Sequence, residues 1–391
     1  MIQEDIPLSN TGTKIRIAFV LWSLEGMGGS ESVVFDIVRK LDKNLFEVLV
    51  IGLKDGPVRQ LYEEIGVKIE VVSKTQKYDF GFVQRIRHVL KKEKIHLVNA
   101  HHFEPLLYSF LATRMTKIKL IYTEHSVWQY LEMDFLKRNL CNFILWNTDA
   151  IVAISKQLLQ YYRDNPFVSK HKTHLIINGI DLSRFKCADR TKLKKELGFR
   201  PNDILIGVVA NLRPEKNHKV LISAFSKLSE TLIDSHLVLV GLDCMDGEIQ
   251  LYASSMRAAD RIHFLGYRQD VTGLLNIFDV FCLSSVNEGL PLVLLEAMAC
   301  GVPVVGSDVM GINEVITDNV NGLLFPNGDE TMLVEKIKKL LREDSLRFKL
   351  HKAGLAYVKE KYCLDDKVRE YTNLFQKMFS KIPIKKTGGC S

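Results

Sequence analysis

Short runs of β-branched and other apolar residues alternate with longer amphipathic stretches along almost the whole chain. This alternation predicts an α/β protein in which parallel strands are joined by crossover helices. In the first half we expect strands at residues 15–22, 47–53, 68–72, 96–100, 118–123, 150–154 and 174–177. In the second half we expect them at residues 204–210, 237–240, 262–265, 280–283, 302–305 and 322–325. Two series of strands predict two doubly wound, Rossmann-like sheets.

A chain of 391 residues is long enough for two or three domains, each with its own core. We place the boundary in the polar segment 178–203, which is rich in turn signals and charges. The predicted domains are residues 1–183 and 184–365. Residues 366–391 form a last helix and tail, which either brace the second domain or pack back on the first. Because ligands of open α/β sheets bind beyond the carboxyl ends of the strands, two facing sheets would share one cleft.

The composition excludes several classes of protein. Apolar residues make up 47% and charged residues 25% of the chain, values typical of globular proteins rather than disordered or fibrous ones. The net charge of +7 is too small for a dedicated nucleic-acid binder, so we expect no nucleic-acid partner. One basic run, Arg85, Arg87, Lys91, Lys92 and Lys94, falls at helical spacing among apolar residues. Such a run is usually a solvated helix face; the alternative is a helix that rests on anionic lipid or an acidic acceptor.

The cysteine pattern and the hydropathy pattern indicate the cellular compartment in which the protein is expected. The seven cysteines are scattered and form no Cys-x-x-Cys pair, which favours reduced thiols over disulfides or a thiolate zinc site. The opening residues lack the order of a signal peptide, and no apolar stretch has the length and purity of a membrane span. We expect a cytoplasmic protein, with any membrane contact peripheral and at the inner face of the cell membrane.

The most informative segment follows the strand expected to end near Leu283. A polar loop leads to Pro291, which stands where a first helical residue is favoured, and Gly301 and Pro303 then end the helix. The free N–H groups at the start of this helix, together with its dipole, would stabilise a diphosphate. The residues of this segment that we predict to bind the diphosphate and the groups attached to it are Asn287, Glu288, Gly289, Leu290, Leu292, Val293 and Glu296.

Two glutamates in this segment have separate expected roles. Glu296 lies in the middle of a very apolar helix, where a carboxylate is costly unless a donor meets it, and the two hydroxyls of a ribose are suitable donors. Glu288 precedes it in the loop, where a sugar beyond the diphosphate would lie. A structural salt bridge or a capping pair is the alternative for both.

These segments resemble family 4 of the retaining GT-B glycosyltransferases, whose Glu-x7-Glu motif matches Glu288 and Glu296. The resemblance covers nearly the whole chain. The other matching segments are Gly28-Gly29-Ser30-Glu31, Ala100-His101, Thr123-Glu124-His125, Asn178-Gly179-Ile180-Asp181 and Ala259-Asp260-Arg261-Ile262 running into Phe264-Leu265-Gly266-Tyr267. The resemblance implies a GT-B fold, two Rossmann-like domains and transfer of a sugar from a nucleotide-diphosphate sugar.

The glycine segment after the first strand lacks the third glycine of a dinucleotide fingerprint, because Glu31 stands at that position. Its small residues would let a phosphate or an acceptor approach the backbone; a plain tight turn is the alternative. The resemblance implies that this loop lines the donor diphosphate and the acceptor entrance. We therefore expect Gly28 and Gly29 to bind the donor and Ser30 to bind the acceptor.

Basic residues follow the first strand of the second domain. Arg213 and Lys216 would neutralise the leaving diphosphate, and solvated loop charges are the alternative. The family usually has an arginine where Asn211 stands, so the sequence departs from the pattern there. We assign that role to Arg213 and count Asn211 among the donor-binding residues.

Three histidines follow strands of the first domain, and any single one is more often a packing residue. The His101 position matches a family histidine beside the transferred sugar, so we expect a catalytic role for it. The predicted catalytic residues are therefore His101, Glu288, Arg213 and Lys216, and the predicted acceptor-binding residues are Ser30, His101, Glu104, His125 and Trp128.

No Asp-x-Asp pair, the pattern that would hold a divalent ion against a diphosphate, occurs in the sequence. We expect no essential metal and no cofactor other than the nucleotide-sugar donor. The predicted activity is transfer of a hexose-type sugar, with retention, to a hydroxyl of a saccharide or lipid-linked acceptor. A nucleotide-sugar epimerase, a phosphorylase and a non-catalytic sugar-nucleotide-binding module are the alternatives.

Overall fold

The computed structural model describes residues 14–26, 28–74, 79, 81–125 and 133–382, and these form two compact units. Unit 1 contains the described residues up to Ile177 together with those from Lys367 onward, and unit 2 contains Asn178–Asp366. The division lies at the start of the polar segment 178–203. Among the described residues, no helix is both long and apolar enough to cross a bilayer.

Unit 1 is a parallel sheet with helices packed against it. Its strands are β1 (Ile15–Leu21), β2 (Phe46–Gly52), β3 (Lys68–Val71), β4 (Leu97–His101), β5 (Lys119–Glu124), β6 (Ala150–Ala153) and β7 (Thr173–Leu175). Its helices are α1 (Gly29–Lys40), α2 (Val58–Glu64), α3 (Phe82–Lys92), α4 (Phe103–Thr113), α6 (Phe135–Asn147), α7 (Lys156–Asp164), the 3-10 helix η1 (Lys170–Lys172) and, from its fourth residue on, α16 (Leu364–Ser380). The strand order is β3-β2-β1-β4-β5-β6-β7.

Unit 2 repeats this plan with a smaller sheet. Its strands are β8 (Ile204–Val209), β9 (Ser235–Val240), β10 (Ile262–Phe264), β11 (Val280–Leu283), β12 (Val304–Ser307) and β13 (Leu323–Phe325). Its helical elements are α8 (Thr191–Glu196), η2 (Pro214–Lys216), α9 (His218–Ser229), α10 (Glu248–Ser254), η3 (Ala259–Arg261), α11 (Val271–Ile277), α12 (Leu292–Ala299), α13 (Ile312–Val315), α14 (Glu330–Arg342) and α15 (Asp344–Lys361). The strand order is β10-β9-β8-β11-β12-β13.

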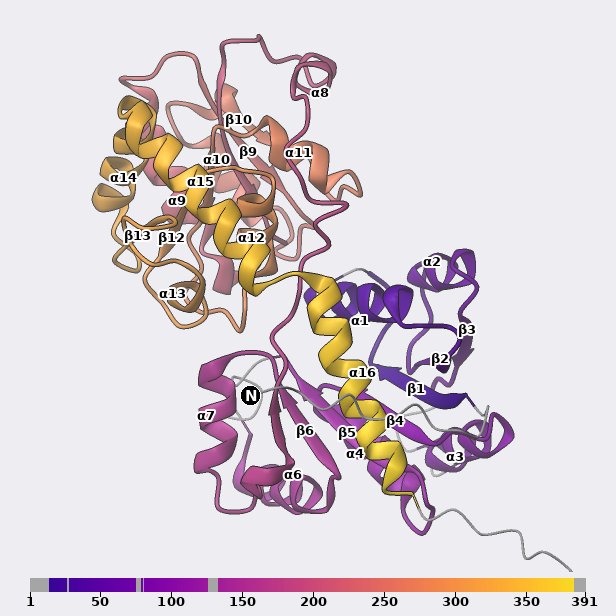
Figure 1. Ribbon diagram of the computed structural model, residues 1–391. Helices are drawn as coiled ribbons and strands as arrows, with labels where there is room; N and C mark the ends of the chain where they lie inside the picture. Colours follow the sequence, from indigo (N-terminus) through magenta and orange to yellow (C-terminus); the bar gives the residue numbers. More distant parts are fainter. Residues whose placement is uncertain (1–13, 27, 75–78, 80, 126–132, 383–391) are drawn as a thin grey trace, which may run out of the picture. The chain divides into compact units, whose positions relative to one another are not determined.

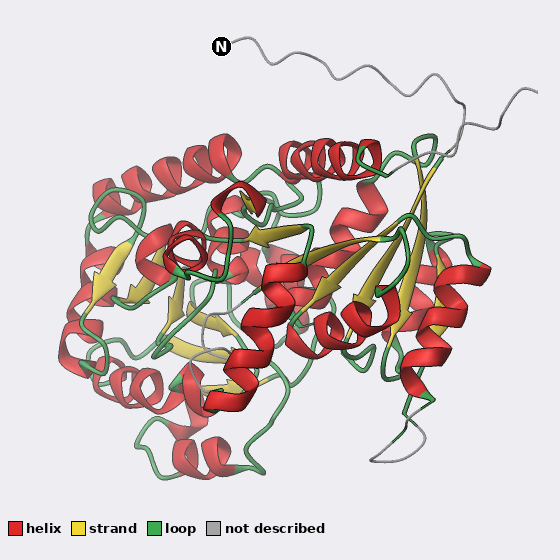
Figure 2. Cartoon of the chain, turned by 90° about the horizontal axis from the view of Figure 1, so that it is seen from below, coloured by secondary structure: helices red, strands yellow, loops and turns green. Residues whose placement is uncertain are grey.

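The prediction of two doubly wound α/β sheets is confirmed. The strands are parallel and mostly buried, so they read as continuous apolar runs, and the helices between them cover the sheets (Figure 2). Each expected strand is present within two residues of its predicted ends, because a buried parallel strand needs an unbroken run of apolar side chains.

Helix α16 returns from the end of the chain to pack on unit 1. The Phe375 ring makes edge contacts with Phe19 of β1 and Phe46 of β2, each with ring centroids 6.0 Å apart. Tyr371 and Phe375 are almost completely buried. Figure 1 shows this yellow helix lying along the indigo and magenta elements of unit 1. The apolar stripe of the last helix therefore contributes to the core of unit 1.

Candidate active site

The predicted site residues follow the central strands of each sheet. In unit 1, β1 lies between β2 and β4, and in unit 2, β8 lies between β9 and β11, so the strand order reverses at both places. Ligands of doubly wound folds bind at such a switch point, because the loops after the two central strands diverge and leave a crevice. The glycine segment follows β1, His101 ends β4, residues 211–216 follow β8, and residues 284–290 follow β11.

Lys216 and Glu288 meet at the switch point of unit 2. Lys216 Nζ lies 2.6 Å from Glu288 Oε1, and both side chains are largely buried. Ser285 Oγ donates a hydrogen bond to the same carboxylate oxygen at 2.6 Å. A charge-assisted hydrogen bond in a partly dry site is strong, so this arrangement fixes the ammonium beside the loop that leads to α12. The sequence named Lys216 and Glu288 but did not predict that they pair, and it gave no role to Ser285.

The loop that carries Glu288 is held in place from both sides. Val286 N donates to the Glu215 carbonyl at 2.9 Å, and Glu288 N donates to the Met310 carbonyl at 3.2 Å. Gly311 has φ +81°, and a Cβ atom there would lie only 2.4 Å from the Glu288 carbonyl oxygen. Glycine is therefore required at position 311 by both conformation and space. The loop is positioned by its neighbours before any ligand binds.

Helix α12 begins one residue later than expected. Pro291 is its N-cap, with φ −75° and ψ 90°, so the prediction that Pro291 is the first helical residue is wrong. The reason is that a proline fixes φ but leaves ψ free, and here ψ lies outside the helical range. The first helical N–H groups, which have no partner within the helix, therefore belong to Leu292 and Val293.

The partly exposed residues of α12 share one face. Leu292, Val293 and Glu296 are half-buried and lie at spacings of three and four residues, whereas Leu294 and Leu295 are fully buried. Three of the predicted donor-binding residues thus lie together on one side of the helix, beginning at its positive end.

Arg213 and Asn211 differ in exposure and in their contacts. Arg213 is exposed, and its Nη1 lies 4.0 Å from Glu215 Oε1, a weak ion pair that a ligand phosphate could replace. The Asn211 side-chain oxygen accepts a hydrogen bond from Leu242 N at 3.0 Å, and its carbonyl lies 3.2 Å from His218 Nε2. Asn211 therefore positions the loop after β9, and Arg213 is the residue whose charge is available for a diphosphate.

The glycine segment of unit 1 opens α1 and leaves space around it. Gly28 is the N-cap, with φ −78° and ψ −176°, a conformation that any residue adopts. A Cβ atom at Gly29 would meet no heavy atom within 4 Å, and at Gly28 it would meet Glu31 Oε2 at 2.6 Å. Ser30 Oγ donates to that same oxygen at 2.9 Å. A left-handed turn is therefore not the reason for these glycines, and the open space favours close approach of a ligand.

Adjacent strands β4 and β5 bring the histidines of unit 1 together. His101 Nδ1 lies 2.9 Å from His125 Nε2, and the two rings stack with centroids 5.2 Å apart. His101 is fully buried, whereas the side chain of His102 is 20% exposed. His102 also has φ +71°, which is rare outside glycine and is often found at functional sites. His102 therefore reaches the surface at the end of β4; His125 is also partly exposed, whereas His101 is not.

Glu124 joins this cluster, and the sequence assigned no role to it. It is almost completely buried and lies 3.3 Å from His102 Nδ1; it also accepts hydrogen bonds from His125 N, at 2.6 Å, and from the Tyr122 hydroxyl. The available signal was a carboxylate at the end of an apolar strand, since a charge in that position needs partners. Glu124 organises the three residues that surround it.

The pKa values of the three histidines shift in opposite directions. Burial lowers the pKa of His101 to about 3, with the charge of His102 adding to the effect, and burial likewise holds the pKa of His125 well below its usual value. Burial would also lower the pKa of His102, but its hydrogen bond to Glu124 and the charge of Glu124 outweigh this and raise it. The cluster thus places His102, whose pKa is raised, beside Glu124 and beside two imidazoles whose pKa values are lowered.

We expect the free energy of unfolding to fall on acidification from about pH 6.5 to about pH 5. In this window unfolded histidines take up protons but folded His101 and His125 do not. Each of the two therefore lowers the free energy of unfolding by about 1.4 kcal/mol per pH unit. His102, whose folded pKa is raised, holds its proton more tightly in the folded state, so it does not contribute to the fall. Urea unfolding at a series of pH values measures the slope.

The variants for this test are His101→Asn and His125→Gln, which keep a polar atom near the nitrogens that pair. Each should flatten the dependence of stability on pH by roughly the contribution of one histidine. His171→Gln, at an exposed position of η1, is the matched control and should leave the slope unchanged. Slopes identical to the wild type in both cluster variants would contradict the assignment of neutral histidines.

Glu104 and Trp128 are the two remaining residues that the sequence predicts to bind the acceptor. Glu104 lies exposed in the first turn of α4, and its charge contributes to the raised pKa of His102. Trp128 lies outside the described residues. Within the described ranges, no three His, Cys, Asp or Glu side chains converge in a way that could hold a metal ion.

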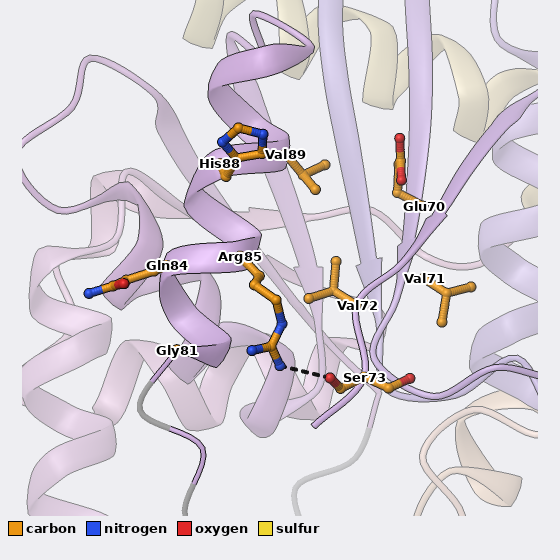
Figure 3. A pocket seen from close by; sticks show the side chains of 9 residues that line it. All are labelled: Glu70, Val71, Val72, Ser73, Gly81, Gln84, Arg85, His88 and Val89. Atoms are coloured by element: carbon orange, nitrogen blue, oxygen red, sulfur yellow. Dashed lines mark hydrogen bonds between the residues drawn. The ribbon is translucent and has the colours of Figure 1, made fainter. Parts of the chain in front are cut away.

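A pocket in unit 1 lies away from these residues, between the end of β3 and α3 (Figure 3). Arg85 reaches across it and donates to the Ser73 carbonyl at 2.9 Å and to Asp79 Oδ2 at 2.6 Å. The apolar residues of α3, among them Phe82 and Ile86, are buried in the unit. The expectation that this basic helix could rest on lipid is therefore not supported, since its apolar face is already covered and Arg85 serves the fold.

Two families of known sequences match the chain in succession. Residues 27–184 match the family described as Glycosyltransferase Family 4, and residues 189–356 match Glycosyl transferases group 1. The chain belongs to glycosyltransferase family 4. The resemblance seen in the sequence is thereby confirmed, and this chain is a glycosyltransferase enzyme.

Curated relatives align with most of this glycosyltransferase. It is 29% identical over 319 residues to N-acetyl-alpha-D-glucosaminyl L-malate synthase of Bacillus anthracis, across 80% of this chain and 83% of the relative. It is 27% identical over 350 residues to UDP-Gal:alpha-D-GlcNAc-diphosphoundecaprenol alpha-1,3-galactosyltransferase of Escherichia coli, across 82% of this chain and 87% of the relative.

Solved structures support the fold of this glycosyltransferase. Anabaena Alr3699/HepE in complex with UDP-glucose has a TM-score of 0.83 at 21% identity, across 93% of this chain and all of that one. The lipopolysaccharide glycosyltransferase WaaG has a TM-score of 0.73 at 17% identity, across 92% and 99% of the two chains. The predicted GT-B fold class is confirmed by these neighbours.

Proposed function

We propose that this glycosyltransferase moves a hexose-type sugar, with retention, from a nucleotide-diphosphate sugar to an acceptor hydroxyl without an essential metal. The observation that carries the proposal is the Lys216–Glu288 pair at the switch point of unit 2. An ammonium fixed there, just before the positive end of α12, suits a departing diphosphate. In the absence of ligand Glu288 neutralises Lys216, and a diphosphate would compete for the same ammonium.

Each group has one task in the proposed reaction. Lys216, Arg213 and the start of α12 stabilise the charge that grows on the leaving diphosphate as its bond to C1 of the sugar breaks. The acceptor oxygen forms the new bond to C1, and the leaving phosphate oxygen takes the acceptor proton. Glu296 holds the ribose hydroxyls, and Glu288 contacts the sugar. Because the acceptor oxygen attacks C1 directly and the leaving phosphate oxygen takes its proton, a covalent nucleophilic role for Glu288 is unnecessary.

The relatives guide the choice of substrates. The Escherichia coli relative is named for a UDP-galactose donor and a diphosphoundecaprenol-linked acceptor, and the Anabaena neighbour is described with UDP-glucose. We therefore propose a UDP-sugar donor and a saccharide or lipid-linked acceptor. The resemblance and the neighbours support this choice of class; the sugar and the linkage depend on a few pocket contacts.

The test is release of the nucleoside diphosphate from UDP-sugars, with and without acceptors, in the presence of EDTA. We expect acceptor-dependent release whose rate EDTA changes by no more than about twofold. We also expect a product whose anomeric configuration, read by NMR, equals that of the donor. Loss of activity in EDTA that Mg²⁺ restores would contradict the metal-free proposal. An epimerised donor without release would favour the epimerase, and binding without either reaction would favour the binding module.

A further inference from the structure

Two cysteines line one pocket of unit 2, at the edge of its sheet that lies opposite the candidate site. The pocket has a volume of about 510 Å³, and its lining includes residues that precede β11 and β12, such as Asp279 and Val302. The predicted donor-binding loop follows β11 instead, at the carboxyl edge. Cys187 and Cys300 both line the pocket, and neither has a role in the proposed reaction. The pocket is therefore a separate feature of unit 2.

The two cysteines are close together although they are distant in the sequence. A Cβ atom at Gly301 would lie 2.8 Å from Cys187 Sγ, so this sulfur touches the residue that follows Cys300. Conversely, a backbone hydrogen bond from Lys186, the residue before Cys187, acts on the Cys300 thiol. Each thiol thus lies against the chain neighbour of the other. The two sulfurs are therefore neighbours at the pocket wall, as a disulfide bond requires.

The segment that carries Cys187 is fixed against helix α11. Ala188 N donates a hydrogen bond to Asn276 Oδ1 at 2.7 Å, and Asn276 Nδ2 donates to the Lys186 carbonyl at 3.1 Å. One buried amide side chain therefore holds the backbone on both sides of Cys187. The same amide interacts with the Cys300 thiol. The proximity of the two cysteines is thus built into the fold of unit 2.

The two thiols differ in exposure and in reactivity. Cys187 is exposed, whereas Cys300 is only 5% exposed. Burial raises the pKa of the Cys300 thiol to about 12, and the charge of Glu296 adds to the effect. A buried thiol of high pKa is a poor nucleophile toward an oxidant in solution, whereas an exposed thiol can meet it. Cys187 is therefore the thiol that reacts first, and Cys300 is placed to react with its product.

His351 supplies a proton acceptor beside Cys187. Its ring approaches the same point as the Cys187 sulfur, since a Cβ atom at Gly301 would lie 2.4 Å from His351 Cε1. His351 Nδ1 lies 2.5 Å from the Gly301 carbonyl oxygen. Because a carbonyl oxygen only accepts, Nδ1 carries the proton of the neutral ring and Nε2 is its acceptor. A thiol next to such an imidazole can give up its proton to the ring and react as the thiolate.

We propose that Cys187 and Cys300 form a thiol switch that hydrogen peroxide closes and a dithiol reductant opens. The Cys187 thiolate, whose proton is held by His351, attacks one peroxide oxygen; the O–O bond breaks, and the departing oxygen takes the proton from His351 and leaves as water. Cys187 is then a sulfenic acid. The Cys300 sulfur attacks the Cys187 sulfur, the S–O bond breaks, and the hydroxyl group leaves as water with the Cys300 proton. Two thiols are thus oxidised to one disulfide, and one peroxide is reduced to two waters.

The disulfide would act on helix α12 from the end opposite the diphosphate. Cys300 is the C-cap of α12, and its N–H donates to the Glu296 carbonyl at 3.0 Å. Bonding to Cys187 moves the Cys300 sulfur, and in a close-packed interior a shift of the last turn passes to the turn that carries Glu296. We therefore expect the disulfide form to bind UDP more weakly than the reduced form. This effect rests on the proposed function, whereas formation of the disulfide does not.

The test is oxidation of the reduced full chain with hydrogen peroxide, followed by alkylation and mass spectrometry of its peptides without reduction. We expect a cross-linked pair of peptides that joins Cys187 to Cys300 and that dithiothreitol separates. In Cys300→Ser, dimedone should trap the sulfenic acid on Cys187. The matched control is Cys244, another exposed cysteine of unit 2, which should be oxidised about tenfold more slowly than Cys187. Cys244→Ser should leave the cross-link intact.

Two further measurements address His351 and the donor site. His351→Gln should slow the oxidation of Cys187 about tenfold or more, because glutamine can keep the hydrogen bond to the Gly301 carbonyl but takes up no proton. In calorimetry, peroxide should weaken UDP binding to the wild type about fivefold or more, reversibly, and leave Cys187→Ser unchanged.

The outcomes separate the switch from the proposed function. Oxidation of Cys187 and Cys244 at equal rates, or the absence of the cross-link, would overturn the thiol switch. Equal UDP affinity of the reduced and disulfide forms would overturn its coupling to α12. A reduced chain that binds no UDP would contradict the proposed function alone, because the cross-link is measured without any ligand.

Discussion

Replacing Lys216 by Ala is expected to lower the rate of sugar transfer at saturating donor about 10²- to 10³-fold. The Lys216 ammonium is fixed at the switch point of unit 2, and its position next to the start of α12 suits the charge that appears on the departing diphosphate. Because that charge is largest in the transition state, the loss should appear mainly in kcat. Steady-state kinetics of nucleoside diphosphate release measure it.

The control for this variant is Lys219→Ala. Lys219 lies in the first turn of the next helix, α9, and pairs with Glu248 at 2.5 Å, so it is a nearby lysine with a salt bridge of its own. Lys216→Ala also leaves Glu288 without its cation, so thermal denaturation should accompany the kinetics, and Lys216→Arg should recover part of the rate. A Lys216→Ala enzyme with native stability and a kcat within about threefold of the wild type would contradict the assignment.

Replacing Glu296 by Ala is expected to weaken binding of the nucleoside diphosphate about 10²-fold. The reason is that two ribose hydroxyls would each lose a hydrogen bond to a charged acceptor, and such bonds contribute about 1.5 to 3 kcal/mol apiece. The carboxylate is half-buried and shares its face of α12 with Leu292 and Val293, so both its burial and its position suit a diol. Isothermal titration calorimetry with UDP measures the change.

A modified ligand makes this test specific to the ribose. The wild type should bind 2′-deoxy-UDP about tenfold more weakly than UDP, because one hydroxyl is missing. Glu296→Ala should bind the two ligands with similar affinity. Glu335→Ala, at an exposed position of α14, is the control and should behave like the wild type. If Glu296→Ala still prefers UDP by the wild-type factor, the carboxylate does not hold the ribose.

The secondary structure was largely readable from the sequence because buried parallel strands and amphipathic helices impose different periods on the apolar residues. Strand β11 begins and ends at the predicted residues. Pro291 shows the limit of such reasoning, because the proline ring fixes φ but not ψ, and the observed ψ of 90° is not helical. The first residue of α12 could therefore not be read from the proline alone.

The candidate site was only partly predictable, for a related reason. Residue types at strand ends indicated Lys216, Glu288, His101 and His125, but no spacing in the sequence shows which strand ends are neighbours. Glu124 was missed because its function depends on three partners that meet it only in the fold. For the basic helix α3 the sequence left a solvated face and a lipid contact open, because the pattern that would suit a lipid surface also suits packing against a sheet.

The order of strands in each sheet is what the sequence left undetermined. The chain by itself determined the alternation of strands and helices, the division into two series of strands and the family. The sheet order then placed β8 beside β11 and β4 beside β5, which brought together Lys216 and Glu288, 72 residues apart, and His101 and His125, 24 residues apart. Local periodicity follows from each residue's own burial, whereas such pairings depend on how whole strands pack, and only the tertiary structure fixes that.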